Sequence, residues 1–244
     1  MKLHISPATT EVLHELADYF VATAREAIAA RGRFSVALSG GSSPKKFYEL
    51  LASDAFKGQL DWTKVYFFFG DERNVPHADP QSNYLMAKTA LFEPLHIAAA
   101  QTFPVDTSLP PAQAAEAYTT AINQHFSGEQ ARFDLVLLGL GDNSHTASLF
   151  PHTSVLSDKT ASAQDVYVEE LKAHRITLTA PLINQARAIA FLVFGEDKAA
   201  AVRHILEDKE DIGNFPAQLI APPDGELHWF LDTAAASKLE QQVT

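Results

Sequence analysis

Apolar residues recur at helical spacing near the start of the chain. The face they form consists of Val12, Leu13, Leu16, Phe20, Ala24, Ala27 and Ile28. This spacing predicts an amphipathic helix that buries one side. We expect a cap at Thr9 or Thr10 and a stop at Gly32, because hydroxyl side chains favour helix starts and glycine favours helix ends.

Shorter apolar runs, rich in β-branched and aromatic residues, follow this helix. They occupy residues 34–38, 65–69, 135–138 and 189–194. Because polar and apolar residues do not alternate strictly in them, they predict strands covered on both faces, as in a parallel sheet packed between helices. Helical patterns lie between them, at about residues 44–51, 82–91, 112–126 and 198–206. A helix followed by repeated strand, loop and helix units predicts an α/β fold.

Neither polar stretch that interrupts this order resembles a linker between domains. The prolines at 110 and 111 and the polar residues 157–164 are too short and too varied in composition. We see no internal repeat, and we expect residues 1–244 to form one domain. Ligands of open α/β sheets bind beyond the carboxyl ends of the strands, so the loops there are where chemistry is expected.

The loop after the first run is rich in glycine and serine. It consists of Ser39, Gly40, Gly41, Ser42 and Ser43, followed by Pro44. Glycines allow a ligand close to the backbone, hydroxyls donate hydrogen bonds, and the free N–H groups of a helix start favour an anion. This pattern predicts a phosphate cradle, and the alternative is a tight turn without a ligand. The Gly-Lys-Ser/Thr ending of a P-loop is missing.

Residues 37–41 also come close to the nucleophile elbow of α/β-hydrolases, which raises a covalent mechanism through Ser39. Such hydrolases normally build several strands before the elbow. Ser39 follows the first run that predicts a strand, so we favour anion binding.

The second run ends in Gly70, Asp71, Glu72 and Arg73. Carboxylates beside a guanidinium at a strand end can orient a substrate or position a catalytic group. The alternative for these residues is a solvated cluster of salt bridges.

The third run leads into a glycine-rich loop, residues 139–151, that carries His145. An imidazole on such a loop is suited to general acid and base catalysis, since its ordinary pKa is near 6.5. Most single histidines are structural or merely exposed, and that alternative stands here. A dinucleotide-binding fingerprint is a further alternative, but Pro151 would end the required helix after about two turns.

Arg175 and Lys198 lie beside predicted strand ends. In an acidic chain, Arg175 could grip a phosphate with two hydrogen bonds and Lys198 could add a point charge, although surface solubility explains most exposed cations. The remaining histidines lack the spacing of metal ligands, so we expect no metal site.

The charge and composition limit the classes of partner that the chain can bind. The formal net charge is −11 at pH 7, which disfavours nucleic acid and anionic membranes, and the chain contains no cysteine. Glu11, Glu15 and Asp18 interrupt any apolar segment of a secretory signal. The apolar run 188–194 is shorter than the roughly 18 to 20 residues that span a bilayer. We expect a cytoplasmic protein.

Five motifs in a fixed order resemble the 6-phosphogluconolactonase family, part of a wider group that includes glucosamine-6-phosphate deaminase. They are residues 39–44, 70–73, 139–151, 175–179 and 228–232, and the resemblance runs from about residue 34 to residue 236. Residues 70–73 and 145–151 look like the lactonase branch. The chain departs at Asn143 and Ser144, where lactonases usually carry Asp-Gly. Ser144 tolerates a positive φ less well than glycine, and Asn143 removes a carboxylate that could tune His145.

The resemblance implies a three-layer α/β/α sandwich around a mainly parallel, Rossmann-like sheet. It implies hydrolysis of 6-phosphoglucono-1,5-lactone, in the oxidative branch of the pentose phosphate pathway, without a metal or organic cofactor. The phosphate would contact Gly40, Gly41, Ser42, Ser43, Arg175 and Lys198. Asp71, Arg73 and His145 would face the lactone ring. The implied partner is the sugar-phosphate lactone, and the chain would be a monomer or a small homo-oligomer.

In the mechanism we expect, His145 removes a proton from water, the water attacks the lactone carbonyl, and the imidazolium protonates the departing ring oxygen. One rival is a deaminase-isomerase acting on glucosamine 6-phosphate. Another is a non-catalytic sugar-phosphate sensor. Such a sensor normally carries a DNA-binding segment, whereas the α/β pattern here starts almost at Met1 and the chain is acidic.

Overall fold

The first helix forms where the apolar spacing predicts it. In this computed structural model, which describes residues 1–240, α1 spans Thr9–Arg31 and buries the predicted apolar face. It ends at Gly32, whose φ of 74° is the left-handed conformation that glycine adopts readily. The predicted hydroxyl cap is wrong: Ala8 is the N-cap, and no side chain caps the helix start.

The runs without alternation form the centre of a parallel sheet. Strands β2 (Phe34–Leu38), β3 (Val65–Phe69) and β5 (Leu135–Leu138) have the predicted bounds. Strand β8 (Ala188–Val193) begins and ends one residue earlier than predicted. Every residue of β2, β5 and β8 is buried, which explains why these strands lack a polar face.

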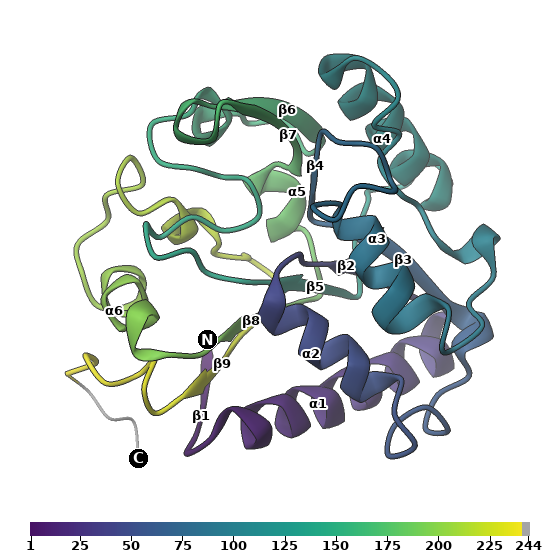
Figure 1. Cartoon of the computed structure of the whole chain (residues 1–244), viewed down its shortest axis with the longest axis horizontal. Coiled ribbons are helices and arrows are strands. Elements are labelled where there is room, and N and C mark those ends of the chain that lie inside the picture. Colours follow the sequence, from purple (N-terminus) through teal and green to yellow (C-terminus); the bar gives the residue numbers. More distant parts are fainter. Residues whose placement is uncertain (241–244) are drawn as a thin grey trace.

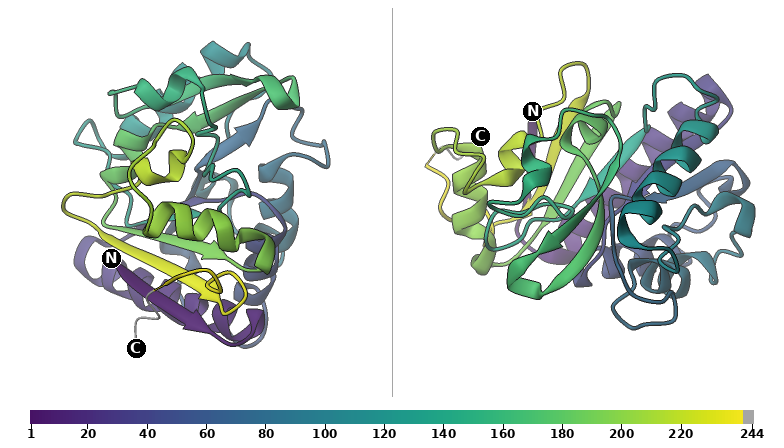
Figure 2. Two further views of the ribbon diagram at one scale, coloured as in Figure 1. Left: turned by 90° about the vertical axis from the view of Figure 1, so that its left-hand side faces the viewer. Right: turned by 90° about the horizontal axis from the view of Figure 1, so that it is seen from above.

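Two further strands complete the sheet at the β8 side, and the sequence pattern did not predict them. Strands β1 (Lys2–Ser6) and β9 (Glu226–Asp232) give a six-stranded sheet in the order β1-β9-β8-β5-β2-β3, in which all neighbours are parallel. The left view of Figure 2 shows β1, β9 and β8 side by side. The predicted order, helix first, is therefore wrong. As an edge strand, β1 alternates polar and apolar residues over only five positions and is mostly half-buried, so its signal is weak.

Helices cover both faces of the sheet, as Figure 1 shows. One face carries α1, α2 (Ser42–Leu51), α3 (Asn83–Ala87) and the π-helical turn Lys88–Phe92. The other carries α4 (Pro111–His125), α5 (Ala180–Asn184) and α6 (Ala199–Leu206). The expected α/β/α sandwich is confirmed. Short 3₁₀ turns lie at Trp62–Lys64, Ala99–Gln101, Ser154–Ser157, Glu169–Leu171, Glu196–Lys198 and Pro216–Leu219.

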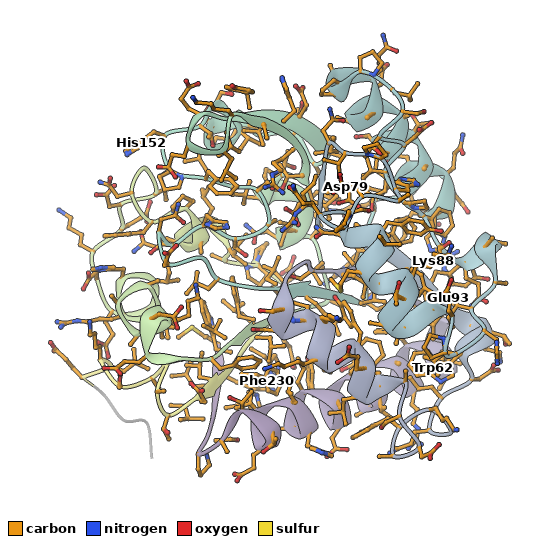
Figure 3. All side chains as sticks on the ribbon, viewed as in Figure 1. Trp62, Asp79, Lys88, Glu93, His152 and Phe230 are labelled. Carbon is orange, nitrogen blue, oxygen red and sulfur yellow. The ribbon has the colours of Figure 1, made fainter. Side chains whose placement is uncertain are left out.

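The core divides into two clusters, one on each face of the sheet. Successive residues of a strand point to opposite faces, so Phe230 packs in the cluster beneath α1 while its neighbours Trp229 and Leu231 pack in the other. Phe230 is fully buried, whereas His152 is exposed and lies at the edge of the molecule in Figure 3. None of the described helices has the length and apolar character needed to cross a membrane.

A small antiparallel sheet lies beyond the end of β3. It has the order β4-β7-β6, formed by β4 (Asp71–Arg73), β7 (Ala173–Leu178) and β6 (Ala163–Val168). Part of the segment 157–164, expected to be a connection, belongs to β6. Gly70 joins the two sheets, since its N–H donates to the carbonyl of Leu38 and its carbonyl accepts from Leu178. Residues far apart in sequence are thereby brought to one rim (Figure 1).

Candidate active site

One cavity of about 490 Å³ opens at the carboxyl ends of the parallel strands. It is lined by the ten residues predicted to bind substrate or act in catalysis, namely Ser39, Gly40, Gly41, Ser42, Ser43, Asp71, Arg73, His145, Arg175 and Lys198. They come from the loop after β2 and the start of α2, from β4, from the loop after β5, from β7 and from the 3₁₀ turn after β8. The folded chain thus gathers these residues in one place, while their individual roles remain predictions.

The glycine-serine loop presents free backbone donors to the cavity. Gly41 is the N-cap of α2 with a φ of 109°, a conformation that side chains rarely permit. Within residues 1–240, the N–H groups of Ser42 and Ser43 donate to no protein acceptor. Unpaired N–H groups at the start of a ten-residue helix favour an anion.

Asn83 links this loop to Asp71, and the sequence did not single it out. A Cβ atom on Gly40 would collide with the side-chain amide of Asn83, so a larger residue there would displace this amide. Asn83 Nδ2 donates to the backbone oxygen of Asp71 at 2.9 Å and to its Oδ1 at 3.3 Å. The hydroxyl of Ser148 donates to Asp71 Oδ2 at 2.6 Å. Both carboxylate oxygens of Asp71 are therefore held in place.

Glu72, the neighbour of Asp71, faces away from the cavity. Its carboxylate accepts hydrogen bonds from the N–H groups of Arg73, Asn83 and Tyr84 and caps the start of α3. Burial raises the pKa of Glu72. Within the described part of the chain, neither Asp71 nor Arg73 forms an ion pair. The salt-bridge alternative for this segment is therefore wrong.

Two arginines face each other across the small sheet. Arg73 of β4 lies directly opposite Arg175 of β7. Arg73 Nη1 donates to the carbonyl of Gln81 at 2.9 Å, whereas the guanidinium of Arg175 has no hydrogen-bond or ion-pair partner in residues 1–240. Burial and the neighbouring Arg73 lower the pKa of Arg175. Like charges held together without an acid between them favour the binding of an anion.

Lys198 completes the positive charge around the cavity. It lies after β8, and its Nζ is 3.3 Å from Asp197 Oδ2. The loop that carries it is fixed from β9, because the carboxylate of Asp232 accepts the N–H of Gly195 at 3.0 Å. The ion pair with Asp197 partly neutralises Lys198. The positive charge of Arg175 is therefore the less compensated of the two.

His145 is oriented by its own loop. Asn143 Oδ1 accepts hydrogen bonds from both the ring Nδ1 and the backbone N–H of His145. Because an amide oxygen can only accept, Nδ1 carries the proton, and the lone pair of Nε2 is free to act as a base. The ring stacks on Phe150 at a centroid distance of 4.1 Å. A Cβ atom on Gly141 would lie 2.0 Å from Nδ1, so this glycine makes room for the ring.

The departure from the family pattern at Ser144 appears in the backbone. Ser144 has a φ of 63°, the positive value at which glycine is usually found. The residue is buried, its N–H donates to the carbonyl of Gly141, and its own carbonyl accepts from Ala217. These bonds compensate for the strained conformation, so the loop keeps a glycine-like turn without a glycine.

The environment of His145 changes its basicity. Burial lowers its pKa to about 4, and the charges of Lys198 and Arg175 act in the same direction, while Asp71 and Asp142 oppose them. The ring is therefore neutral at pH 7. An anion bound beside it would raise its pKa again.

The competing interpretations of the two glycine loops find no support. Ser39 Oγ donates to the carbonyl of Gly40, and in the described chain it has no histidine partner. The loop that carries His145 continues through turns and not into a helix, as a dinucleotide fingerprint would require. Three further residues shape the site and were not singled out from the sequence: Asn83, Ser148 and Phe150. Ser148 and Phe150 lie in the loop of residues 139–151 that carries His145, where residues that contact the site were foreseeable. No residue near Asn83 in the sequence indicates its contact with Gly40.

The chain is similar to known proteins in sequence and in fold. Residues 7–229 match the model of a family described as glucosamine-6-phosphate isomerases/6-phosphogluconolactonase, and the chain belongs to this family. It is 42% identical to a 6-phosphogluconolactonase of Synechocystis sp. over 219 residues, covering 88% of each chain. It is 38% identical to a 6-phosphogluconolactonase of Homo sapiens, covering 86% of this chain and 82% of the relative. The solved structure of 6-phosphogluconolactonase from Trypanosoma cruzi superposes with a TM-score of 0.87 at 28% identity, covering 98% of this chain and 97% of the other.

Proposed function

We propose that this chain hydrolyses 6-phosphoglucono-1,5-lactone to 6-phosphogluconate, as the names of its relatives suggest. The observation that carries the proposal is that one cavity holds a loop with free backbone N–H groups, an arginine without an ion pair in the described residues, and a neutral imidazole with a free Nε2. The loop and the arginine suit the binding of a phosphate group, and the imidazole suits the activation of water.

The phosphoryl group of the substrate lies against the cradle and the cations. The N–H groups of Ser42 and Ser43, together with Arg175 and Lys198, donate to its oxygens. This contact is distant from the reacting carbonyl, and its binding energy holds the lactone ring in a fixed orientation. Asp71 and Arg73 face the ring, where the fixed carboxylate of Asp71 accepts hydrogen bonds from sugar hydroxyls.

In the chemical step, His145 Nε2 takes a proton from a water molecule while the water oxygen bonds to the lactone carbonyl carbon. The tetrahedral intermediate collapses, the bond from this carbon to the ring oxygen breaks, and the imidazolium returns the proton to that oxygen. The products are the open-chain acid and neutral His145. Such proton transfer accelerates reactions by roughly 10² to 10⁴. Asn143 keeps the ring in the tautomer that this step requires.

The electrostatics favour the transition state over the resting enzyme. The imidazolium is disfavoured in the empty cavity, where burial and two cations lower the pKa of His145. The bound phosphate dianion neutralises those cations, and the developing oxyanion stabilises the imidazolium further. The base is therefore most effective when substrate occupies the cavity. We further propose that the reaction takes place in the cytoplasm and involves no nucleic acid.

The experiment is a hydrolysis assay on lactone generated in place, measured against its spontaneous hydrolysis and repeated with a chelator. We expect the protein to accelerate ring opening with and without the chelator. Ammonia release from glucosamine 6-phosphate is measured in parallel. Release of ammonia without lactone hydrolysis would replace this proposal with the deaminase activity, and inactivity in both assays would contradict an enzymatic role.

A further inference from the structure

Two buried tyrosine hydroxyls meet the ends of two neighbouring strands. Tyr48 of α2 accepts the N–H of Ser39 at 3.0 Å and donates to the carbonyl of Ser39 at 2.8 Å. Tyr118 of α4 accepts the N–H of Phe69 at 2.7 Å and donates to the carbonyl of Phe69 at 3.0 Å. Each hydroxyl therefore satisfies both backbone groups of one residue.

These backbone groups lie where the sheet offers no partner. Pairing of β2 with β5 ends at Ala37, two residues before Ser39. Phe69 ends β3, which is an edge strand of the six-stranded sheet. A strand residue directs its N–H and C=O to the same side, and a hydroxyl both donates and accepts, so one tyrosine replaces one residue of a neighbouring strand.

The two tyrosines are equivalent in burial but come from opposite layers. Tyr48 is 0% exposed and packs with α1, whereas Tyr118 is 3% exposed and packs in the other core cluster. Burial raises the pKa of both hydroxyls, which keeps them protonated and able to donate. Removing either oxygen would leave an N–H and a C=O without a protein partner, buried at Phe69 and partly buried at Ser39.

Each tyrosine holds the backbone directly before a different part of the cavity. Ser39 is the first residue of the glycine-serine loop, where two successive glycines leave the backbone otherwise free to vary. Phe69 precedes Gly70 and Asp71, so the other bond pair fixes the point at which the chain crosses from the main sheet to the small one. The two anchors act on separate segments.

We propose that Tyr48 and Tyr118 are positioning residues with separable roles: Tyr48 shapes the phosphate loop, and Tyr118 places Asp71 and Arg73 against the reacting ring. For the role of Tyr118, the second of the two, this proposal rests on the proposed function. The first role concerns the binding of a phosphate group alone, and it can be measured without any turnover. Preorganising a loop improves affinity because less ordering remains to be done on binding.

The experiment compares Tyr48→Phe with Tyr118→Phe, which remove the same atom and the same number of hydrogen bonds. Binding of inorganic phosphate is measured by calorimetry, and kcat and KM are measured on the lactone. We expect Tyr48→Phe to weaken phosphate binding and raise KM by about tenfold, and Tyr118→Phe to lower kcat by about tenfold with phosphate binding unchanged. Tyr66→Phe is the control, since the hydroxyl of Tyr66 has no hydrogen bond in residues 1–240.

A purely structural role would lower the melting temperature of both variants equally and leave phosphate affinity the same in both, and that result overturns the proposal. So does the absence of phosphate binding by the unsubstituted protein. If lactone hydrolysis fails in the unsubstituted protein while the phosphate difference persists, the proposed function falls and the role of Tyr48 stands.

Should either variant not fold, amide hydrogen exchange of the unsubstituted protein provides the test. We expect the N–H of Ser39 to exchange at least about tenfold more slowly than those of Gly40 and Gly41, and phosphate to slow the amides of the loop, including those of Ser42 and Ser43, but not that of Ser39. Equal rates for the three amides before phosphate is added would contradict the anchoring of Ser39.

Discussion

The charged side chains at the two ends of the central sheet differ in how far they are paired. At the amino ends, Asp134 precedes β5 and is fully paired: it accepts the N–H of Ser35 at 2.8 Å and lies 2.8 Å from Arg31 and 3.4 Å from Arg187. At the carboxyl ends, Arg73 and Arg175 face each other, and no acid in residues 1–240 forms an ion pair with either. Both arginines are half-buried, and the buried Nε atom of each has no hydrogen-bond partner in the described part of the chain. Since proteins rarely leave buried polar atoms unpaired, this arrangement indicates a ligand.

The histidines show the same contrast. In His228, near the start of β9, both ring nitrogens have partners: Nε2 lies 2.8 Å from Glu226 Oε2, and Nδ1 lies 3.0 Å from the ring of His4. His145 uses only Nδ1, and Nε2 has no partner within the described residues. Burial lowers the pKa of both histidines. A paired ring stabilises the fold, whereas a ring with one free nitrogen is available for chemistry.

The largest expected effect is a loss of kcat on replacing His145, which the matched replacement of His228 should not show. His145→Ala removes the proposed base, and we expect kcat to fall by roughly 10² to 10⁴ while binding of inorganic phosphate stays the same. In His228→Ala we expect the reverse pattern, a lower melting temperature with kcat unchanged. Near-normal turnover by His145→Ala would remove the catalytic role from this residue.

Removing the unpaired cation should affect capture of the substrate. Arg175→Ala loses charged hydrogen bonds to the phosphate, and we expect kcat/KM to fall by about tenfold to a hundredfold, mainly through KM. Thermal stability should stay the same or rise slightly, because repulsion by Arg73 is removed. Arg175→Lys keeps the charge but not the paired donors and should recover part of the loss. An unchanged kcat/KM in Arg175→Ala would contradict the phosphate role.

A substitution at the amino ends of the strands should change the stability of the fold and not its activity. Asp134→Ala leaves the buried N–H of Ser35 unpaired, and we expect the free energy of unfolding to fall by about 1 to 3 kcal/mol. Urea denaturation measures this change, and kcat/KM of the folded variant should be unaffected. A large loss of activity without a loss of stability would show that the two ends are not independent.

The smallest effect concerns the pH profile. Because the pKa of His145 in the free enzyme is lowered to about 4, the neutral base is present above that pH, and kcat/KM should be lost only as the pH falls through about 4. Asn143→Asp places a carboxylate beside Nδ1, which favours the imidazolium and should move this loss to higher pH by about one unit. NMR titration of the ring in the two free proteins measures the shift, and identical titration curves would contradict it. Rate profiles need correction for the substrate phosphate, whose second pKa is near 6.

The sequence by itself determined the local parts of this protein. The runs 34–38, 65–69 and 135–138 are strands with the predicted bounds, because a strand buried on both faces needs consecutive apolar residues. Nine of the ten site residues predicted from the sequence follow an apolar run, and parallel strands bring such loops to one rim. Arg175 reaches the same cavity from the small antiparallel sheet.

Only the tertiary structure decided the contacts between segments distant in the chain. The pairing of Arg73 with Arg175 depends on the register of a small sheet whose strands are about a hundred residues apart in sequence. Neither the lowered pKa of His145 nor the anchoring of Ser39 by Tyr48 can be read from nearby residues, because burial and unpaired backbone groups are set by the packing of the whole fold. The sequence places chemical groups on loops, and the fold determines which of them remain without a partner.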